Sequence, residues 1–394
     1  MDQRAARILC CLFLGLATLG VGGEASAVPH MSLLSGAPCA TCHVSAAGGG
    51  VRNELGWYTG ADMGAISYDD LGLAEALPET NTFLDGYLSF GYDVRIQWAR
   101  AGRPPATDVL PDMVTIPMQL QPGGALYLLD WLTISGSYNV GPRTFEGAAC
   151  DPHFAGQECF DAAAVIDVDP SLPALRTGML TPSHGIRHDD HTMLYFSSAL
   201  NHRSPLIPPN HADPGAELGY QPNPWFRLDT GVYHPGNLEA AVQAPGLEVD
   251  VGKVSYLGRV SFMPQYLEAG LNSWIGVSVY GSGAFRHEIG FLGVGINDLA
   301  ALQFEMSRFE RAEERGWSGL VELTGQVLQW MHLQARAEIS RARRGASERE
   351  VRQYVFGAQI FPLPYWEIRP EYRLVEVKDD YLLGSVAVQL HQFF

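Results

Sequence analysis

The sequence predicts an all-β fold, a transmembrane antiparallel β-barrel of about 16 strands in residues 81–394. Three observations predict it: apolar and polar residues alternate in many segments, short and longer connections alternate between them, and the chain ends in phenylalanine on an alternating strand. After residue 27, no run reaches the ~18 apolar residues that a membrane-spanning helix needs. The alternative fold is a large secreted β-protein.

The alternation of side chains is clearest between Leu84 and Trp98. Even-numbered residues there are mostly apolar, whereas the odd-numbered ones include Asp85, Asp93 and Arg95. Because side chains alternate across a strand, one face suits lipid and the other suits the lumen. Similar segments bring the total to 16, and they lie at 114–128, 131–140, 172–180, 192–200, 216–221, 225–234, 251–263, 270–281, 284–295, 298–309, 317–329, 331–341, 350–361, 366–376 and 382–394. The fourth and fifth of these have the weakest pattern, so 14 strands is the alternative.

The connections between these segments differ in length. Short ones lie at 129–131, 222–225, 329–330 and 362–366. Longer polar ones lie at 101–112, 142–171, 235–250, 310–316 and 342–349. In outer-membrane barrels the short turns face the periplasm and the longer loops face the exterior. The short turns are flanked by tryptophans that suit an interfacial girdle, namely Trp131, Trp225, Trp330 and Trp366.

The polar faces of the later segments carry many charges. A charge that faces lipid near the bilayer midplane of a barrel costs ~2–4 kcal/mol, so these side chains should line the lumen. They are Arg286, Glu288, Gln303, Glu305, Ser307, Gln334, Arg336, Glu338, Glu367, Arg369, Glu371 and Arg373. The last segment ends at Phe394, which resembles the C-terminal signal for insertion into the outer membrane, although Gln392 replaces the aromatic residue usual two positions earlier.

Residues 1–27 have the pattern of an export signal. Arg4 and Arg7 precede an apolar run, and Ala25-Ser26-Ala27 forms a cleavage site, so the mature chain should start at Val28. Two of the six cysteines leave with this signal. Export to an oxidising compartment favours a disulfide between two of the four that remain, Cys150 and Cys159, and the alternative is two unrelated thiols.

The other two cysteines belong to the motif Cys39-Ala40-Thr41-Cys42-His43. Two thiols at this spacing can bind one haem covalently, and the histidine that follows can ligate its iron. A redox dithiol or half of a zinc site would use the same spacing. Neither has its usual context here, because no βαβ pattern surrounds the motif and the next cysteine is Cys150. The motif therefore predicts one haem c, held by Cys39, Cys42 and His43.

The segment 28–80, between the signal and the barrel, should carry this haem. Its aromatic residues are Trp57, Tyr58 and Tyr68, too few for a core of its own. We therefore expect it to form a haem-bearing plug in the periplasmic mouth or the lumen of the barrel.

This layout of an export signal, one C-x-x-C-H motif and a barrel of about 16 strands resembles the fused monohaem cytochrome-porins of iron-oxidising bacteria. The resemblance rests on the whole layout and on Cys39, Cys42 and His43. It implies electron transfer across the outer membrane, Fe(II) as a donor, and a periplasmic cytochrome or similar redox carrier as partner. The chain departs from the family after the motif, where residues 48–56 replace the expected Pro-x-Leu-x-x-Phe-Gly type of run.

A second segment rich in histidine, arginine and aspartate spans 178–191. Counting strands from the N-terminus places it on the periplasmic side, where Arg187 could bind a haem propionate. His191 is the candidate distal ligand of the iron, and the alternative is a structural loop whose charges neutralise each other. Other candidates for the distal position are His30, Met31 and Met63.

Acidic residues outnumber basic ones by 43 to 26, which gives a net charge of −17. This excess argues against a nucleic-acid partner and favours cations and basic redox partners. Carboxylates near the exterior could admit Fe(II), although loop acids are more often simply solvated. One such group is Asp151, Glu158, Asp161, Asp167 and Asp169, and another is His211, Asp213 and Glu217.

These patterns predict an outer-membrane electron-transfer protein that passes electrons between the cell exterior and periplasmic carriers. Whether it is also an enzyme that oxidises Fe(II) is left open by the sequence. The alternative function is a diffusion porin whose haem plug gates or senses. A haem peroxidase is a third reading, and it would need an open distal position with an acid–base pair beside it.

Overall fold

The computed structural model describes residues 29–394 except 38–40, 46–47, 49, 74, 76–77, 103–111, 140–159, 170, 189–192, 209–210, 244–246 and 267–268. The predicted signal 1–27 lies outside these residues, as do Cys39, Cys150, Cys159 and His191.

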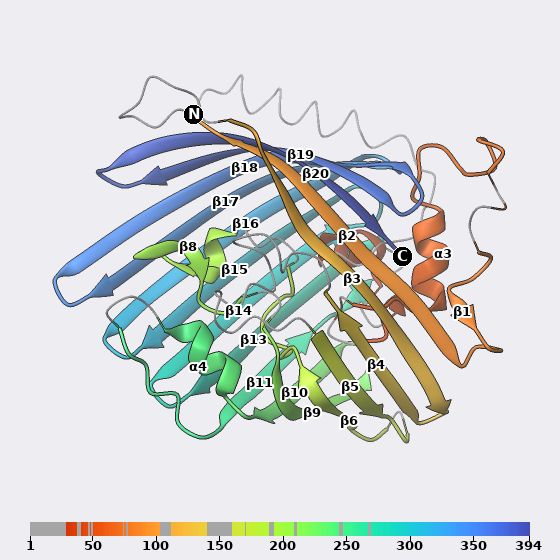
Figure 1. Cartoon of the computed structure of the whole chain (residues 1–394), viewed down its shortest axis with the longest axis horizontal. Helices are drawn as coiled ribbons and strands as arrows, with labels where there is room; N and C mark the ends of the chain where they lie inside the picture. Colours follow the sequence, from red (N-terminus) through yellow and green to blue (C-terminus); the bar gives the residue numbers. More distant parts are fainter. Residues whose placement is uncertain are drawn as a thin grey trace.

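Sixteen antiparallel strands close into a barrel (Figure 1), which confirms the predicted fold class. The last strand pairs with both the preceding strand and the first wall strand, and Ile96 lies opposite Leu390 at this closure. The wall strands are β2 (Leu88–Ala101), β3 (Val114–Leu129), β4 (Leu132–Tyr138), β5 (Phe160–Ile166), β6 (Ala174–Leu180), β9 (Asp213–Asn223), β10 (Phe226–Tyr233), β11 (Ser255–Phe262), β13 (Leu271–Ser282), β14 (Phe285–Ile296), β15 (Ala300–Arg311), β16 (Glu314–Leu328), β17 (Met331–Arg344), β18 (Ser347–Leu363), β19 (Trp366–Val377) and β20 (Tyr381–Phe393).

The smaller elements lie at the rims or inside the barrel. Two-residue strands β1 (Thr82–Phe83) and β12 (Gln265–Tyr266) extend the sheet beside β2 and β13. The other elements are α2 (Pro29–Ser35), α3 (Glu54–Ala61), η3 (Leu194–Phe196), β7 (Ser197–Ser198), β8 (Asn201–Pro205) and α4 (Gly236–Val242). Within the described ranges, no helix combines the length and apolarity that crossing a bilayer requires.

The two faces of each strand differ as the alternation predicts, and β15 shows it best. Leu302, Phe304 and Met306 point outward and are 48%, 43% and 50% exposed. Gln303 and Glu305 between them are 1% and 0% exposed. An apolar exterior and a polar interior are the arrangement that a lipid surround favours.

The barrel has two unlike rims. The short-turn rim carries the C-terminus, α3 and the turns 130–131, 224–225, 297–299, 329–330 and 364–365 (Figure 1). At the opposite rim, the loop rim, lie the ends of β2 and β3, β4 and β5, β6 and β9, and β10 and β11, which longer connections join. Two longer loops expected there, at 310–316 and 342–349, are instead two-residue turns at 312–313 and 345–346. The reason is that β15 to β18 extend beyond the band of exposed apolar side chains on the outer face, and the residues of this extension carry charges.

Two strand assignments from the sequence were wrong. Residues 192–200 were expected in the wall, but residues 194–200 form η3, β7 and the turn after it inside the barrel, where Leu194 and Ala199 are buried. Conversely, β5 lies within the segment 142–171 that was expected to be a loop. Its alanine-rich sequence has little alternation, so the pattern missed it. The two errors cancel, which is why the strand count was still right.

Most of the charged residues expected in the lumen are there, but one pair is not. The side chains of Arg286 and Glu288 are 57% and 36% exposed on the outer face, while His287 and Ile289 point inward. These outward charges lie within four residues of the β13–β14 turn, at the loop rim and past the apolar band. The cost of a charge in lipid therefore does not apply to them.

The tryptophans beside the short turns divide into two pairs. Trp131 and Trp225 are 42% and 53% exposed at the short-turn rim, as an interfacial girdle requires. Trp330 packs against the interior core instead, and the indole of Trp366 donates to the hydroxyl of Tyr68 at 3.3 Å. Trp330 thus contacts the interior core, and Trp366 contacts the N-terminal segment.

Candidate functional site

Two segments of the chain pack against the inner face of the barrel or across its short-turn rim. One is the N-terminal segment 29–73, and the other is the connection 181–208 between β6 and β9. Their apolar side chains share one buried cluster with inward side chains of the wall, including Met31 and Trp57 from the first segment, Ile186 and Tyr195 from the second, and Phe291 from β14. This shared core is the setting of the candidate site.

Helix α2 is fixed to the inner surface of β13–β15. The Asn272 side chain donates to the Leu33 carbonyl at 2.8 Å, and the Asp298 amide donates to the Leu34 carbonyl at 3.2 Å. Both leucines are almost fully buried. A side chain at Gly295 would collide with the backbone of Leu33, so glycine permits this close approach.

The described half of the haem motif folds back on the start of α3. His43 pairs in an antiparallel bridge with Arg52, and the Asn53 amide donates to the Cys42 carbonyl at 3.1 Å. Cys42 and His43 are each 6% exposed. A side chain at Gly56 would strike the Cys42 carbonyl oxygen, so the motif and the helix can touch only because this residue is glycine.

Helix α3 carries this unit onto the end of the barrel wall. Trp57 stacks on Tyr365 with ring centroids 4.5 Å apart and meets Phe394 edge-on at 5.0 Å. The Tyr365 hydroxyl donates to the Trp57 carbonyl at 2.9 Å. The guanidinium of Arg52 lies 4.3 Å above the ring of Phe393. The segment with the C-x-x-C-H motif thus packs against Tyr365 and the last two residues, Phe393 and Phe394.

The residues around the motif fit a covalently bound haem. A thiol at Cys42 and an imidazole at His43 are the donors that such a group needs, and both are buried. Arg52 and Arg187 are cations in or beside this segment that suit propionates. Among the described residues, no three or more His, Cys, Asp or Glu side chains are placed to hold a metal ion.

The connection 181–212 leaves the wall at the loop rim, so its expected position on the periplasmic side was wrong. The missed strand β5 is the reason, because one additional strand reverses the side on which every later connection emerges. The connection nevertheless turns into the lumen. The Gly185 amide donates to Ser278 at 2.9 Å, and Arg187 donates to the Gly48 carbonyl at 3.3 Å. It therefore reaches the N-terminal segment from the opposite end of the barrel.

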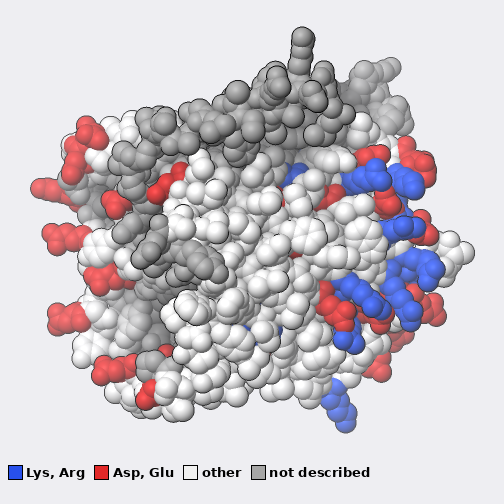
Figure 2. Space-filling view, turned by 180° about the vertical axis from the view of Figure 1, so that it is seen from behind, with Lys and Arg blue, Asp and Glu red and all other residues white. Residues whose placement is uncertain are grey.

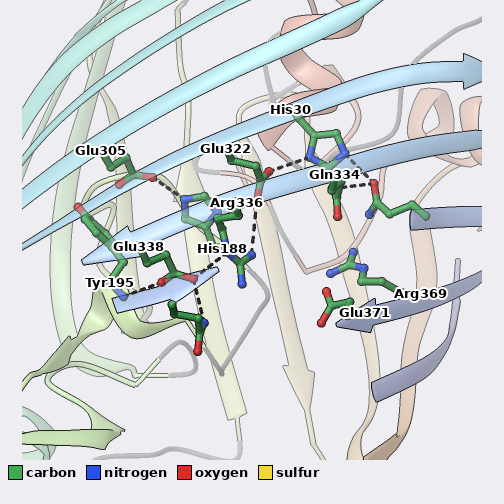
Figure 3. A network of polar contacts seen from close by, with 12 residues as sticks. His30, His188, Tyr195, Glu305, Glu322, Gln334, Arg336, Glu338, Arg369 and Glu371 are labelled. Atoms are coloured by element: carbon green, nitrogen blue, oxygen red, sulfur yellow. Dashed lines mark hydrogen bonds and ion pairs between the residues drawn. The ribbon is translucent and has the colours of Figure 1, made fainter. Parts of the chain in front are cut away.

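Polar side chains attach the rest of this connection to the wall (Figure 3). His188 forms a buried ion pair with Glu305, and the Tyr195 amide donates to Glu338 at 2.8 Å. Further along, Ser340 donates to the Ser197 carbonyl at 3.0 Å. This part of the connection, which includes η3 and β7, thus lies on the inner face of the wall that includes β15–β17.

A polar network continues from this part of the connection to α2 (Figure 3). Arg336 lies between Glu338, at 2.8 Å, and Glu322, at 3.5 Å. His30 is 3.7 Å from Glu322 and hydrogen-bonds Gln359 at 2.7 Å. His30 is therefore already engaged with the wall, which weakens it as a distal ligand. Met31 and Met63 remain candidates inside the core.

Burial and charge set the protonation of the inserted histidines. Burial lowers the pKa of His184, and neighbouring His287, at 3.1 Å, lowers it further. Burial also lowers the pKa of His188, but the Glu305 carboxylate more than offsets this, so the net pKa is raised. The pKa of His30 is lowered, chiefly by burial. The surroundings of the connection thus favour the protonated form of His188 and the neutral form of His184.

The described members of the two predicted carboxylate groups do not gather into an exterior metal site. Asp167 and Asp169 lie on the turn between β5 and β6, which is at the short-turn rim rather than outside. Asp161 accepts a hydrogen bond from the Ser137 amide at 2.9 Å, and Asp151 and Glu158 lie outside the described residues. The second group is buried, as its contacts show. His211 pairs with Asp213 at 3.1 Å, and Glu217 pairs with Arg176 at 3.0 Å.

Sequence reasoning missed the residues that hold the motif in place, chiefly Arg52, Trp57 and Tyr365. A signal for α3 was present, since Asn53 is a good N-cap and its side chain accepts from the Gly56 amide at 3.0 Å. The partners Tyr365 and Phe394 lie about 300 residues away in the chain, so no local pattern indicates the contact.

Comparison with solved structures shows the same kind of barrel. The loop-deleted OmpT of Vibrio cholerae aligns with a TM-score of 0.52 at 10% identity, over 78% of this chain and 99% of that one. The outer-membrane channel DcaP of Acinetobacter baumannii gives 0.53 at 11%, over 78% and 97%. OprB of Pseudomonas putida gives 0.54 at 9%, over 84% and 98%. No family model and no curated protein matches the sequence. The chain therefore has the fold of outer-membrane, porin-like barrels, which supports an outer-membrane location and contact with lipid.

Proposed function

We propose that this protein transfers electrons across the outer membrane, between the cell exterior and a periplasmic carrier, through one haem c held by Cys39, Cys42 and His43. Fe(II) is the external donor that we would test first. The observation that supports the proposal is the burial of the motif: Cys42 and His43 are each 6% exposed, in a segment that packs on Tyr365 and Phe394 at the short-turn rim of the barrel.

In this function, the described residues would bind the haem, balance its charge and exclude water. A bound haem would supply an iron that alternates between two oxidation states. Cys42 and His43 would hold it, and Arg52 and Arg187 would balance its carboxylates. The shared core packs apolar side chains inside the barrel, among them Tyr195 and Ile186, and so excludes water there. This favours electron transfer without solute flow. One such centre does not span the ~30 Å hydrocarbon layer alone, so a partner must approach it from the short-turn rim or the loop rim.

Proteoliposomes with ferricyanide enclosed and Fe(II) outside test this proposal. The wild type should reduce the enclosed oxidant while sucrose stays excluded. Cys42→Ser should lose at least nine-tenths of this rate together with its covalent haem, because one attachment point is gone. Thr41→Ser keeps both cysteines and the histidine, and it should behave as the wild type. Wild-type vesicles that carry haem yet leave the oxidant unreduced would refute the proposal.

The second candidate function is a porin-like diffusion channel that the inserted segments gate. The comparisons support this reading better than electron transfer, because the similar structures are porin-like barrels and one of them, DcaP, is an outer-membrane channel. The same vesicles separate the two functions. Rapid swelling in sucrose or arginine without reduction of ferricyanide would establish the channel.

A further inference from the structure

The outer surface of the barrel at the loop rim carries a patch of alternating charges across β14–β19. We call this patch the arginine–carboxylate lattice, and its members are Arg286, Glu288, Arg308, Glu310, Arg315, Arg341, Glu348, Glu350, Arg352 and Glu376. Figure 2 shows Lys and Arg gathered with acids at one end of the wall, past a broad zone without charge. These side chains play no part in the site inside the lumen.

Strand register places opposite charges next to each other at several points of the lattice, although Arg315 also lies across from Arg343. Arg286 lies across from Glu310, which lies across from Arg315 on the next strand. Arg352 lies across from Glu376, and their side chains are 3.7 Å apart. The arginines are well exposed, with 57% to 68% of the side chain accessible at Arg286, Arg308 and Arg315. Ion pairs this exposed are worth about 0–1 kcal/mol, so a stronger anion can displace the carboxylate.

The lattice begins where the apolar band ends. On β15, exposed Phe304 and Met306 are followed on the same face by Arg308 and Glu310, at a spacing of ~7 Å per residue pair. This is the level of the lipid headgroups. The opposite rim differs, because the exposed charges in its described part are acidic (Figure 2), including Asp62, Asp130 and Asp167. Solubility alone would not collect the arginines at one rim.

We infer that the lattice binds phosphorylated lipid headgroups of the outer leaflet. Guanidinium groups bind phosphate through two parallel hydrogen bonds, and each has five N–H donors, more than one carboxylate uses. The carboxylates between them can share divalent cations with the phosphates, since both supply the oxygen ligands that Mg²⁺ and Ca²⁺ prefer. This inference depends on the outer-membrane fold and not on the haem, so either proposal can fail without the other.

Native mass spectrometry of the full-length mature protein in detergent, with added diphosphoryl lipid A, tests this inference. The wild type should bind it at least tenfold more tightly than its dephosphorylated form. The triple variant Arg308→Gln, Arg315→Gln, Arg341→Gln should lose at least tenfold in affinity, because the phosphates lose their donors. The matched control Glu288→Gln, Glu310→Gln, Glu350→Gln, in the same patch, should bind at least as tightly as the wild type in EDTA.

Heat-modifiable migration in gels verifies that both variants form the closed barrel. Equal binding of phosphorylated and dephosphorylated lipid by the wild type would overturn the inference. So would an arginine variant that binds as the wild type does. If the lattice instead joins copies of the chain, the wild type should be an oligomer, and the arginine variant should be a monomer with unchanged lipid affinity. This result would also overturn the inference.

Discussion

The two segments inside the barrel are attached to its wall by different chemistry. The N-terminal segment is held chiefly by aromatic packing, such as Trp57 on Tyr365, and by hydrogen bonds to its backbone, such as that from the Asn272 side chain to the Leu33 carbonyl. The connection 181–208 is held largely by charged and titratable groups, such as His188 with Glu305. They meet where Arg187 donates to the Gly48 carbonyl. The first should therefore be fixed over the whole physiological range, whereas the second should respond to pH.

Removing the aromatic anchor should have the largest effect. Trp57→Ala deletes a ring that is 2% exposed, and large-to-small changes of this kind cost ~3–5 kcal/mol. The N-terminal segment should then detach from the short-turn rim, and trypsin should cleave after Arg52 at least tenfold faster in the folded protein. Tyr58→Ala is the control, because Tyr58 is 47% exposed. Equal cleavage rates for the two variants would contradict the proposed anchor.

Breaking the buried ion pair should have the next largest effect, and on the other segment. Glu305→Gln leaves His188 with a neutral partner, at a cost of ~1–3 kcal/mol. The connection should leave the lumen more often, and planar bilayers should record more frequent and longer openings. Glu310→Gln alters an exposed pair on the outer face and should leave the conductance as in the wild type. If both variants behave alike, the pair does not hold the connection.

A change of pH in either direction from neutral should weaken the attachment of the connection 181–208 to the wall. His188 has a raised pKa, so its contribution is full below ~6.5 and is lost as the pH rises through the raised value. His184 has a lowered pKa, so its contribution is full above ~6.5 and is lost as the pH falls. Each pH unit between the folded and unfolded pKa is worth ~1.4 kcal/mol. Conductance should be lowest near neutral pH, and His188→Gln should remove the alkaline rise. A flat profile in the wild type would refute this account.

An exposed ion pair outside both segments should matter least. Arg349, near the start of β18, and Asp380, on the turn between β19 and β20, are 2.9 Å apart at the loop rim, and both are exposed. Arg349→Gln should change the free energy of unfolding in urea by less than ~1 kcal/mol. A larger loss would show that the turns between the long strands, and not only the lumen contacts, stabilise the barrel.

The sequence predicts the wall well because lipid and lumen impose opposite demands on neighbouring residues. On β15 the alternation from Leu302 to Ser307 indicates both the strand and the direction of each side chain. It fails where those demands weaken. In β5, alanine suits either face, so Ala162, Ala163 and Ala164 give no alternation, and omitting that strand reversed the expected side of the next long connection.

The candidate site could be predicted only in part. Cys42 and His43 were indicated by their spacing alone, and the structure places both in a buried turn. The side chains that hold this turn, among them Tyr365 and Phe393, come from the far end of the chain, and only the closed barrel brings them together. The entry of residues 181–208 into the lumen likewise depends on tertiary contacts, such as those with Glu305 and Glu338.

The most direct test of a covalent haem inside the barrel is the alkaline pyridine spectrum of the mature protein, purified from the outer-membrane fraction and washed with acidified acetone. The account predicts the absorption of a thioether-bound haem, at one haem per chain, in the wild type. A protein without that absorption, or one that releases all of its haem into the acetone, would contradict it.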